Sequence, residues 1–223
     1  MNIQSALKEV LASLPEGVTL VAVSKFHSEE KLMAAYEAGQ RVFGENHVQE
    51  MTRKYEALPK DIQWHFIGHL QTNKVKYIAP FVSMIHAVDS FKLLKEIEKQ
   101  AANCDRVIPV LLELHIAEEE TKYGWSLEQC RQFLADGEWR QMTHVHIVGL
   151  MMMASYVDDE AQINAEFQLA SDFFDEVKRD FFADDPAFSQ RSWGMSHDYP
   201  LAIQHHSTMV RIGTAIFGER VYQ

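Results

Sequence analysis

The chain has 223 residues, of which 47% are hydrophobic and 24% are charged, so its composition is that of a globular protein with a substantial core. Its 21 Lys and Arg residues stand against 32 Asp and Glu residues, and the formal net charge of -11 argues against binding to nucleic acid. No run of about eighteen apolar residues occurs, so we expect no transmembrane helix. Two cysteines without a CxxC pair exclude a disulfide framework and fit a reducing cytoplasm.

The first quarter of the chain reads as helix, strand, helix, strand. Residues 1–14 have the pattern of an amphipathic helix, without the basic start and uninterrupted apolar run of a signal peptide. Residues 18–25 are apolar and rich in β-branched side chains, which predicts a strand that is buried on both faces. A helix then runs from Ser28, a suitable N-cap, to Gly39, and residues 41–46 predict a second strand.

The same alternation continues to the end of the chain. The remaining helices are predicted at residues 48–57, 73–78, 90–103, 126–135, 159–182 and 198–205. The remaining strands are predicted at residues 62–68, 82–89, 106–116, 144–151, 189–195 and 209–218. Eight strands that alternate with helices predict a (β/α)8 TIM barrel, and a chain of this length has room for one such domain over residues 1–223. A doubly wound sheet is the alternative, but no glycine-rich dinucleotide motif follows the first strand.

The strand ends are the segments to search, because barrels of this type carry their chemistry at the C-terminal ends of the strands. Lys25 ends an otherwise apolar strand, where partial loss of water favours the neutral, nucleophilic amine. This position suits a lysine that forms an imine. A lysine that simply emerges into solvent is the alternative, and position alone does not decide between them.

A phosphate site is predicted near the other end of the chain. Arg211, Gly213 and Thr214 are expected on the final strand, where Gly213 would let successive backbone N–H groups approach an anion. Barrels commonly bind phosphate near their last two strands. Three hydroxyl residues could add donors, namely Ser196, Ser207 and Thr208. For the last two, a turn and a helix cap are equally plausible roles.

Several histidine pairs raise the question of a zinc site. They are His65 and His69, His144 and His146, and His205 and His206. None lies in an HExxH motif, and histidines that alternate on a strand are more often packed or hydrogen-bonded, so we expect no metal. Met151, Met152 and Met153 are interpreted as core filling beside a pocket. Both cysteines fall in or near predicted helices, so no cysteine nucleophile is expected.

Seven segments together give a more specific signal than any single motif. They are AVSK (22–25), FGENHVQE (43–50), WHFIGHLQTNK (64–74), HAVDS (86–90), GLM (149–151), WGMSHDYPLAI (193–203) and STMVRIGTAIFG (207–218). In this order they closely resemble the YggS/PROSC family of pyridoxal phosphate homeostasis proteins over essentially the whole chain. The resemblance implies a single (β/α)8 barrel similar to the N-terminal domain of alanine racemases, the fold type III pyridoxal phosphate proteins.

The resemblance also implies a cofactor site. Lys25 would hold pyridoxal 5'-phosphate as a Schiff base, Arg211 would face the pyridine nitrogen, and Ser196 with the backbone of Gly213 and Thr214 would hold the phosphate. The other residues that it assigns to the pocket are Asn46, His65, Met151 and Met195.

Three segments depart from the family pattern. His47 stands where the family usually has the Tyr of GENY, and His206 stands where a Gly usually precedes Ser-Thr. Residues 113–115 read Glu-Leu-His in place of the usual Gln-Val-Asn. The fine shape of the pocket is therefore expected to differ from that of the family.

The chemistry of Arg211 favours a carrier over a catalyst. An arginine can only donate, so it would keep the pyridine nitrogen unprotonated and leave the cofactor a weak electron sink. Related racemases draw a base from a second domain of a partner subunit, for which this chain has no room. We therefore expect a cytoplasmic, monomeric protein that buffers pyridoxal phosphate or delivers it to apo-enzymes. An amino-acid racemase or lyase is the first alternative, and a phosphate-sugar or nucleotide-binding barrel without an imine is the second.

Overall fold

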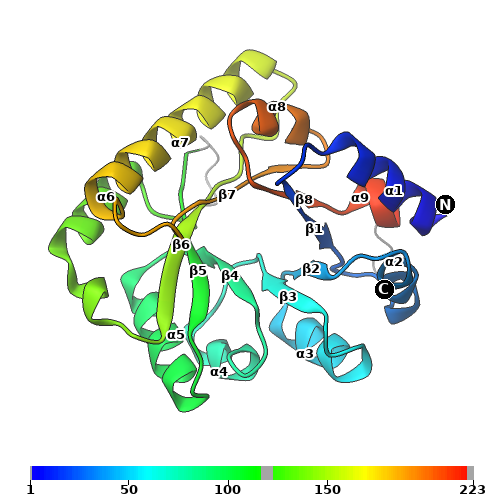
Figure 1. Ribbon diagram of the computed structural model, residues 1–223, viewed down its shortest axis with the longest axis horizontal. Coiled ribbons are helices and arrows are strands. Elements are labelled where there is room, and N and C mark those ends of the chain that lie inside the picture. The colour runs from blue at the N-terminus through cyan, green and yellow to red at the C-terminus, as the bar shows by residue number, and fades with distance from the viewer. Residues whose placement is uncertain (1, 117–122, 220–223) are drawn as a thin grey trace.

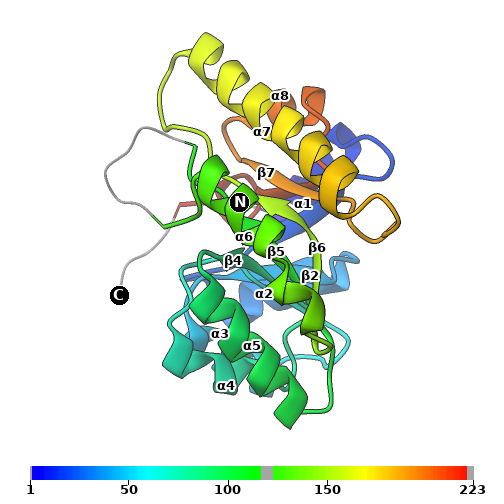
Figure 2. The ribbon, with the colours of Figure 1, turned by 90° about the vertical axis from the view of Figure 1, so that its left-hand side faces the viewer.

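Eight parallel strands close into a barrel, and helices surround it (Figures 1 and 2). The computed structural model describes residues 2–116 and 123–219 of the chain. The strands are β1 (Thr19–Val23), β2 (Val42–Glu45), β3 (Gln63–Phe66), β4 (Met84–Val88), β5 (Ile108–Glu113), β6 (Val145–Met151), β7 (Gln190–Met195) and β8 (Met209–Ile212). Each strand pairs with the next in sequence, and β8 pairs with β1. The predicted (β/α)8 barrel is confirmed.

The helices follow the predicted alternation. They are α1 (Ile3–Ser13), α2 (Glu29–Glu37), α3 (Val48–Ala57), α4 (Val75–Ile78), α5 (Phe91–Asn103), α6 (Leu127–Asp136), α7 (Glu160–Phe181), α8 (Tyr199–Gln204) and α9 (Thr214–Phe217), with 3-10 turns η1 (Thr72–Lys74) and η2 (Glu138–Gln141). Ser28 caps α2 as predicted, although its side chain makes no capping hydrogen bond. In the part of the chain that the structure describes, no helix is long and apolar enough to cross a bilayer.

Successive residues of each strand point alternately to the helices and into the barrel. In β1, Leu20 and Ala22 pack in the main core with the helices, whereas Val21 packs inside the barrel with Met209 of β8. A second small cluster inside the barrel contains Leu111 and Met151. The prediction that β1 is buried on both faces is therefore confirmed.

One glycine is required by the close approach of two strands. Gly149 of β6 lies beside Gln190 of β7, and a Cβ atom at this position would lie 1.8 Å from the Gln190 carbonyl oxygen. No side chain fits there, because a distance of 1.8 Å is far inside van der Waals contact.

The last strand is shorter than predicted. It ends at Ile212, and the chain turns at Gly213 into the short helix α9, which begins at Thr214. The prediction that Gly213 and Thr214 lie on this strand is therefore wrong. Both still follow the strand end directly, so their backbone lies at the mouth of the barrel, where the strand ends meet.

Candidate functional site

A cavity of about 550 Å³ lies at the C-terminal ends of the strands. Its lining residues are Val23, Lys25, Asn46, Ile67, Met153, Tyr156, Met195, Ser196, His197, Arg211, Gly213 and Thr214. Seven of the nine predicted site residues are among them, although they come from segments almost 190 positions apart in the sequence. A cavity of this volume suits a small-molecule ligand.

The other two predicted residues do not line this cavity. Met151 is fully buried in the small cluster inside the barrel with Leu111 and Val148. His65 is buried and hydrogen-bonded to His86. The nearby Met153, predicted to fill the core, is 44% exposed and lines the cavity instead.

The guanidinium of Arg211 is buried and held from three directions. Its Nη1 donates to the backbone oxygen of Ser192 at 2.5 Å and to the Ser192 hydroxyl at 2.7 Å. Its Nη2 donates to the backbone oxygen of Met152 at 2.9 Å. Burial lowers the pKa of Arg211 to about 10, which leaves the group charged at neutral pH. Three of its five N–H groups are thus used, and two remain for a ligand.

A chain of hydrogen bonds continues from Arg211 into the barrel. The Ser192 hydroxyl lies 2.9 Å from Nδ1 of His86, whose Nε2 lies 2.9 Å from Nδ1 of His65. Because Arg211 can only donate, Ser192 accepts from it and donates its own proton to His86, which then donates from Nε2 to His65. Burial lowers the pKa of both rings, that of His65 to about 4, so both are neutral near pH 7.

The segment after β7 is fixed by a buried carboxylate. Asp198 accepts a hydrogen bond from the backbone N–H of Met195 at 2.5 Å, and its own N–H donates to the Met195 carbonyl at 3.2 Å. This turn places Ser196 at the cavity, where its hydroxyl accepts from the N–H of Gly213 at 3.3 Å. The turn after β7 and the turn after β8 are therefore joined directly.

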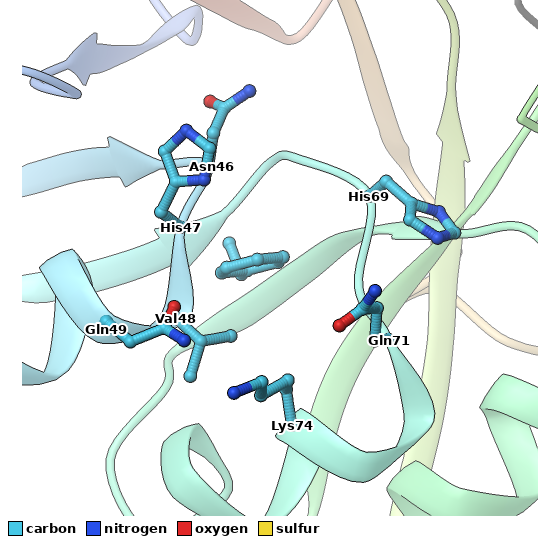
Figure 3. A pocket seen from close by; sticks show the side chains of 8 residues that line it. Asn46, His47, Val48, Gln49, His69, Gln71 and Lys74 are labelled. Carbon is cyan, nitrogen blue, oxygen red and sulfur yellow. The ribbon is translucent and has the colours of Figure 1, made fainter.

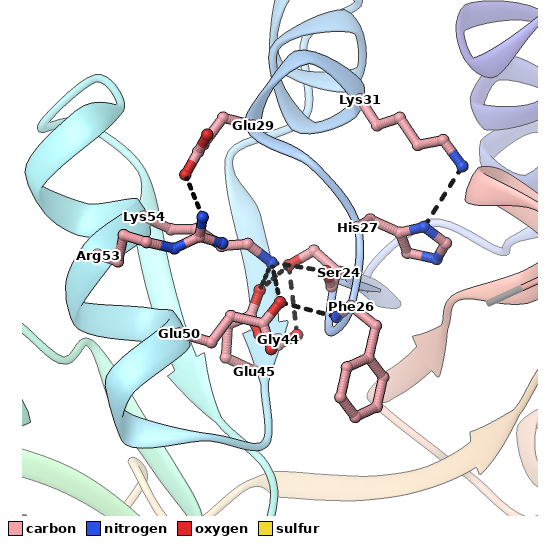
Figure 4. A network of polar contacts seen from close by, with 10 residues as sticks. All are labelled: Ser24, Phe26, His27, Glu29, Lys31, Gly44, Glu45, Glu50, Arg53 and Lys54. Carbon is pink, nitrogen blue, oxygen red and sulfur yellow. Dashed lines mark hydrogen bonds and ion pairs between the residues drawn. The ribbon is translucent and has the colours of Figure 1, made fainter. Parts of the chain in front are cut away.

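The backbone on both sides of Lys25 is held by a buried ionic network (Figure 4). Lys54 of α3 is fully buried, and its ammonium donates to the carbonyl of Ser24 at 2.8 Å. The same ammonium lies 2.7 Å from carboxylate oxygens of both Glu45 and Glu50. Three acceptors thus satisfy all three of its protons.

The two carboxylates complete this clamp around Lys25. Glu45 accepts from the Ser24 hydroxyl at 2.6 Å, and Glu50 accepts from the backbone N–H of Phe26 at 2.7 Å. Phe26 has a φ of 65°, a left-handed conformation that a bulky residue rarely adopts. The bond from Glu50 stabilises that turn, which directs the chain out of the barrel directly after Lys25.

Comparison with known proteins agrees with this geometry. The family model described as alanine racemase, N-terminal domain, matches residues 2–221. The chain belongs to this family. Among curated relatives, a pyridoxal phosphate homeostasis protein of Aquifex aeolicus is 40% identical over 91% of this chain and 87% of its own length. A protein of the same name from Schizosaccharomyces pombe is 38% identical over 91% of this chain and 84% of its own length.

Solved structures give the same result. PipY of Synechococcus elongatus PCC7942, whose structure is described with PLP bound, is 35% identical, with a TM-score of 0.88 over 97% of this chain and all of PipY. Alanine racemase from E. faecalis shares the fold, with 17% identity and a TM-score of 0.73 over 98% of this chain and 58% of the racemase. The resemblance to the YggS/PROSC family is therefore confirmed.

The site contains residues that the sequence did not reveal. Tyr156 and His197 line the cavity from loops whose course no local pattern predicts. Ser192 and His86 are buried polar residues on strands, and only the barrel register brings them to Arg211. For Lys54 the sequence indicates burial only weakly: the residue lies three positions after the buried Met51 and therefore on the same face of a short amphipathic helix.

One departure from the family pattern has an electrostatic consequence. Glu113 ends β5 inside the barrel, and its Oε2 is buried without a hydrogen-bond partner. Burial, together with the charge of Asp89, raises its pKa from 4.5 to about 7, while Arg211 opposes the shift. A carboxyl with a raised pKa holds its proton in the folded chain at pH values where the unfolded chain has released it. Stability therefore falls as the pH rises from about 4.5 to about 7.

We expect Glu113→Gln to remove this pH dependence. The amide cannot ionise, so the variant should gain about 2–3 kcal/mol in free energy of unfolding relative to the original protein at pH 8, and little at pH 4.5. Urea denaturation of the apo-protein at a series of pH values measures it. Glu56→Gln, at an exposed position of α3, is the control and should show no such trend. Parallel pH curves for all three proteins would refute the assignment.

We expect Lys54→Met to cost about 3–5 kcal/mol in free energy of unfolding, since it leaves two carboxylates without their cation, one of them fully buried. Arg53→Met changes the adjacent residue, whose side chain is 63% exposed and pairs with Glu29 at 3.3 Å. That control should lose less than about 1 kcal/mol. Equal losses in the two variants would show that the buried network contributes no more than a surface ion pair.

Proposed function

We propose that the chain binds pyridoxal 5'-phosphate as a Schiff base on Lys25 and acts in cofactor homeostasis, as a buffer or a donor to apo-enzymes. One observation carries the proposal: Lys25, Arg211 and the Ser196–Gly213 contact meet in a single cavity at the barrel mouth. The names of the curated relatives and the similarity to PipY, a protein described with PLP bound, support it.

The groups in the cavity fit this cofactor. Arg211 has two N–H groups left for an acceptor such as the pyridine nitrogen, and its position is fixed by Ser192 and Met152. Ser196 and the backbone of Gly213 and Thr214 supply neutral donors for a phosphate group. Asn46 has a buried Oδ1 atom without a hydrogen-bond partner, which suits a hydroxyl donor of a ligand.

Each residue would then have a defined role. Lys25 supplies the amine, and the Lys54 network fixes the backbone from which that amine extends. Arg211 orients the ring and keeps a positive charge beside its nitrogen. When bound, the cofactor would withdraw electrons from the carbon atom that carries the amine. A protonated ring nitrogen strengthens this effect. An arginine cannot provide that proton at neutral pH, so this site suits storage better than catalysis.

The rim of the cavity also favours exchange over turnover. Met153 is 44% exposed and Tyr156 is 78% exposed, so water reaches the residues around the entrance. Exclusion of water strengthens the electrostatic interactions on which catalysis depends. An accessible site therefore supports uptake and release of the cofactor.

We further propose a single domain over residues 1–223, a monomer, and a cytoplasmic location.

We expect the purified protein to be yellow when loaded with cofactor and to lose its visible band in Lys25→Ala, because the chromophore requires that amine. Borohydride reduction and peptide mapping by mass spectrometry should place the phosphopyridoxyl group on Lys25. Lys8→Ala, at an exposed position of α1, is the control and should keep both the band and the adduct. An adduct found consistently on another lysine would reject the assignment.

We expect no racemisation, transamination or decarboxylation above the rate of the free cofactor, because Arg211 leaves the cofactor a weak electron sink. The loaded protein is incubated with a panel of L-amino acids in deuterated water, and α-proton exchange and products are followed by NMR. A parallel assay follows transfer of the cofactor to an apo-enzyme. Saturable turnover that disappears in Lys25→Ala would replace the carrier function with that of a racemase or lyase.

A further inference from the structure

The cofactor cavity, of about 550 Å³, shares a wall with each of two smaller cavities. The first, of about 240 Å³, lies between the start of α3 and the segment around η1 (Figure 3), and Asn46 lines both it and the cofactor cavity. The second, of about 320 Å³, is lined by Tyr156, Val157, Asp158 and His197. Two of these residues, Tyr156 and His197, also line the cofactor cavity. The two walls differ in how they are held.

The wall at Asn46 is fixed by close backbone packing. Asn46 follows Glu45, the last residue of β2, whose carboxylate lies 2.7 Å from the buried Lys54 ammonium. Gly68 approaches it so closely that a Cβ atom there would lie 2.7 Å from the Asn46 carbonyl oxygen. This wall therefore cannot yield without a shift of the strand ends themselves.

The wall at Tyr156 is formed by side chains of two loops. Tyr156 belongs to the loop between β6 and α7, and His197 to the loop between β7 and α8. Their ring centres lie 5.0 Å apart at an interplanar angle of 78°. Nε2 of His197 lies 3.3 Å from Oδ2 of the buried Asp198, which fixes the turn after β7. The position of Tyr156 in this wall depends on its own loop.

That loop has two anchors. The first is Met152, whose N–H donates to the Ser192 carbonyl at 3.2 Å and whose carbonyl accepts from Arg211 at 2.9 Å. Met152 is therefore bound to the barrel. The second anchor is Ser155, a buried residue that is hydrogen-bonded to Glu166 of α7. The loop is thus tied to the barrel at its start and to a helix three residues later.

The bonds to Glu166 use both of its carboxylate oxygens. Oε2 accepts from the Ser155 backbone N–H at 2.7 Å, and Oε1 accepts from the Ser155 hydroxyl at 2.6 Å. Gln162, one turn earlier on α7, donates to Oε1 at 3.1 Å. Glu166 is buried, and charge-assisted hydrogen bonds are stronger than neutral ones. Met153 lies two residues before Ser155 and Tyr156 directly after it, so this carboxylate holds both at the cavity wall.

We propose that Glu166 is a positioning residue that sets the rate at which the cofactor enters and leaves its cavity. It does not line the cavity, and it acts through Ser155 on Met153 and Tyr156. The inference rests on the proposed cofactor function. Local opening of a loop limits ligand exchange where the loop must move to let the ligand pass. Loss of the Glu166 bonds therefore speeds binding and release by the same factor and leaves the Kd unchanged.

The test compares Glu166→Ala with Glu176→Ala, the same substitution on the same helix. Glu176 pairs with Arg131 of α6 at 2.6 Å and is outside the cavity lining. Stopped-flow absorbance follows binding of pyridoxal 5'-phosphate to the apo-protein, and loss of the visible band on dilution follows release. Glu166→Ala should raise both rates about tenfold, the effect of one charge-assisted hydrogen bond, and leave the Kd within about twofold. Glu176→Ala should change neither rate.

Two milder variants keep the test valid if Glu166→Ala folds poorly. Ser155→Ala removes the hydroxyl bond but keeps the backbone bond, so it should raise both rates less. Glu166→Gln keeps one oxygen for the Ser155 N–H and should restore most of the original rates. A readout without cofactor is amide hydrogen exchange of the apo-protein by NMR, in which the Ser155 N–H should lose protection in Glu166→Ala and keep it in Glu176→Ala.

The possible failures can be told apart. Unchanged rates in Glu166→Ala despite lost protection of the Ser155 N–H would overturn the proposal, because the loop would then open without affecting exchange. Equal changes in Glu166→Ala and Glu176→Ala, or faster release with a raised Kd, would also overturn it. Failure of the original protein to bind the cofactor would reject the cofactor function itself, and this inference with it.

Discussion

The pairing of β1 with β8 is the constraint on which the site depends. Val21 lies opposite Arg211 and Ala22 opposite Ile212, so the first and last strands end at the same level. Lys25 and Gly213 follow these ends and therefore meet at one cavity, although nearly the whole length of the chain separates them. Each strand between β1 and β8 pairs with the next one in sequence, and these pairings complete the barrel. Without closure of the barrel these residues would lie at opposite edges of a sheet.

Two buried cations are stabilised in different ways. Lys54 has two carboxylates and a carbonyl as acceptors, so its charge is neutralised locally. Arg211 is held by carbonyl and hydroxyl oxygens, which accept three of its five N–H groups without cancelling its charge. The first arrangement fixes a backbone segment, while the second leaves a positive potential in a cavity. The difference explains why Lys54 and Arg211 can both be buried although only Arg211 faces the cavity.

The sequence predicts the architecture well because stretches with strand patterns alternate with amphipathic helices along the whole chain. Lys25, Ser196 and Arg211 can be found because they follow or end such strands. The partners of these residues cannot. Ser192 and His86 are ordinary residues on strands until the register places them beside Arg211, and His65, predicted to line the pocket, lies in this chain of hydrogen bonds instead. The placement of Met153 in the core is wrong because side-chain direction in an irregular segment has no periodic signal.

The direction of the hydrogen bonds from Arg211 to His65 has a consequence for proton movement. Every donor in this row of hydrogen bonds points away from the guanidinium. The rings of His86 and His65 therefore have no lone pair left along the row to accept another proton. Release of a proton at its far end would require Arg211 to lose one, which at neutral pH costs about 4 kcal/mol for a pKa of about 10. The row of two imidazoles and a hydroxyl thus stabilises the charge of Arg211 but does not transfer protons to or from it.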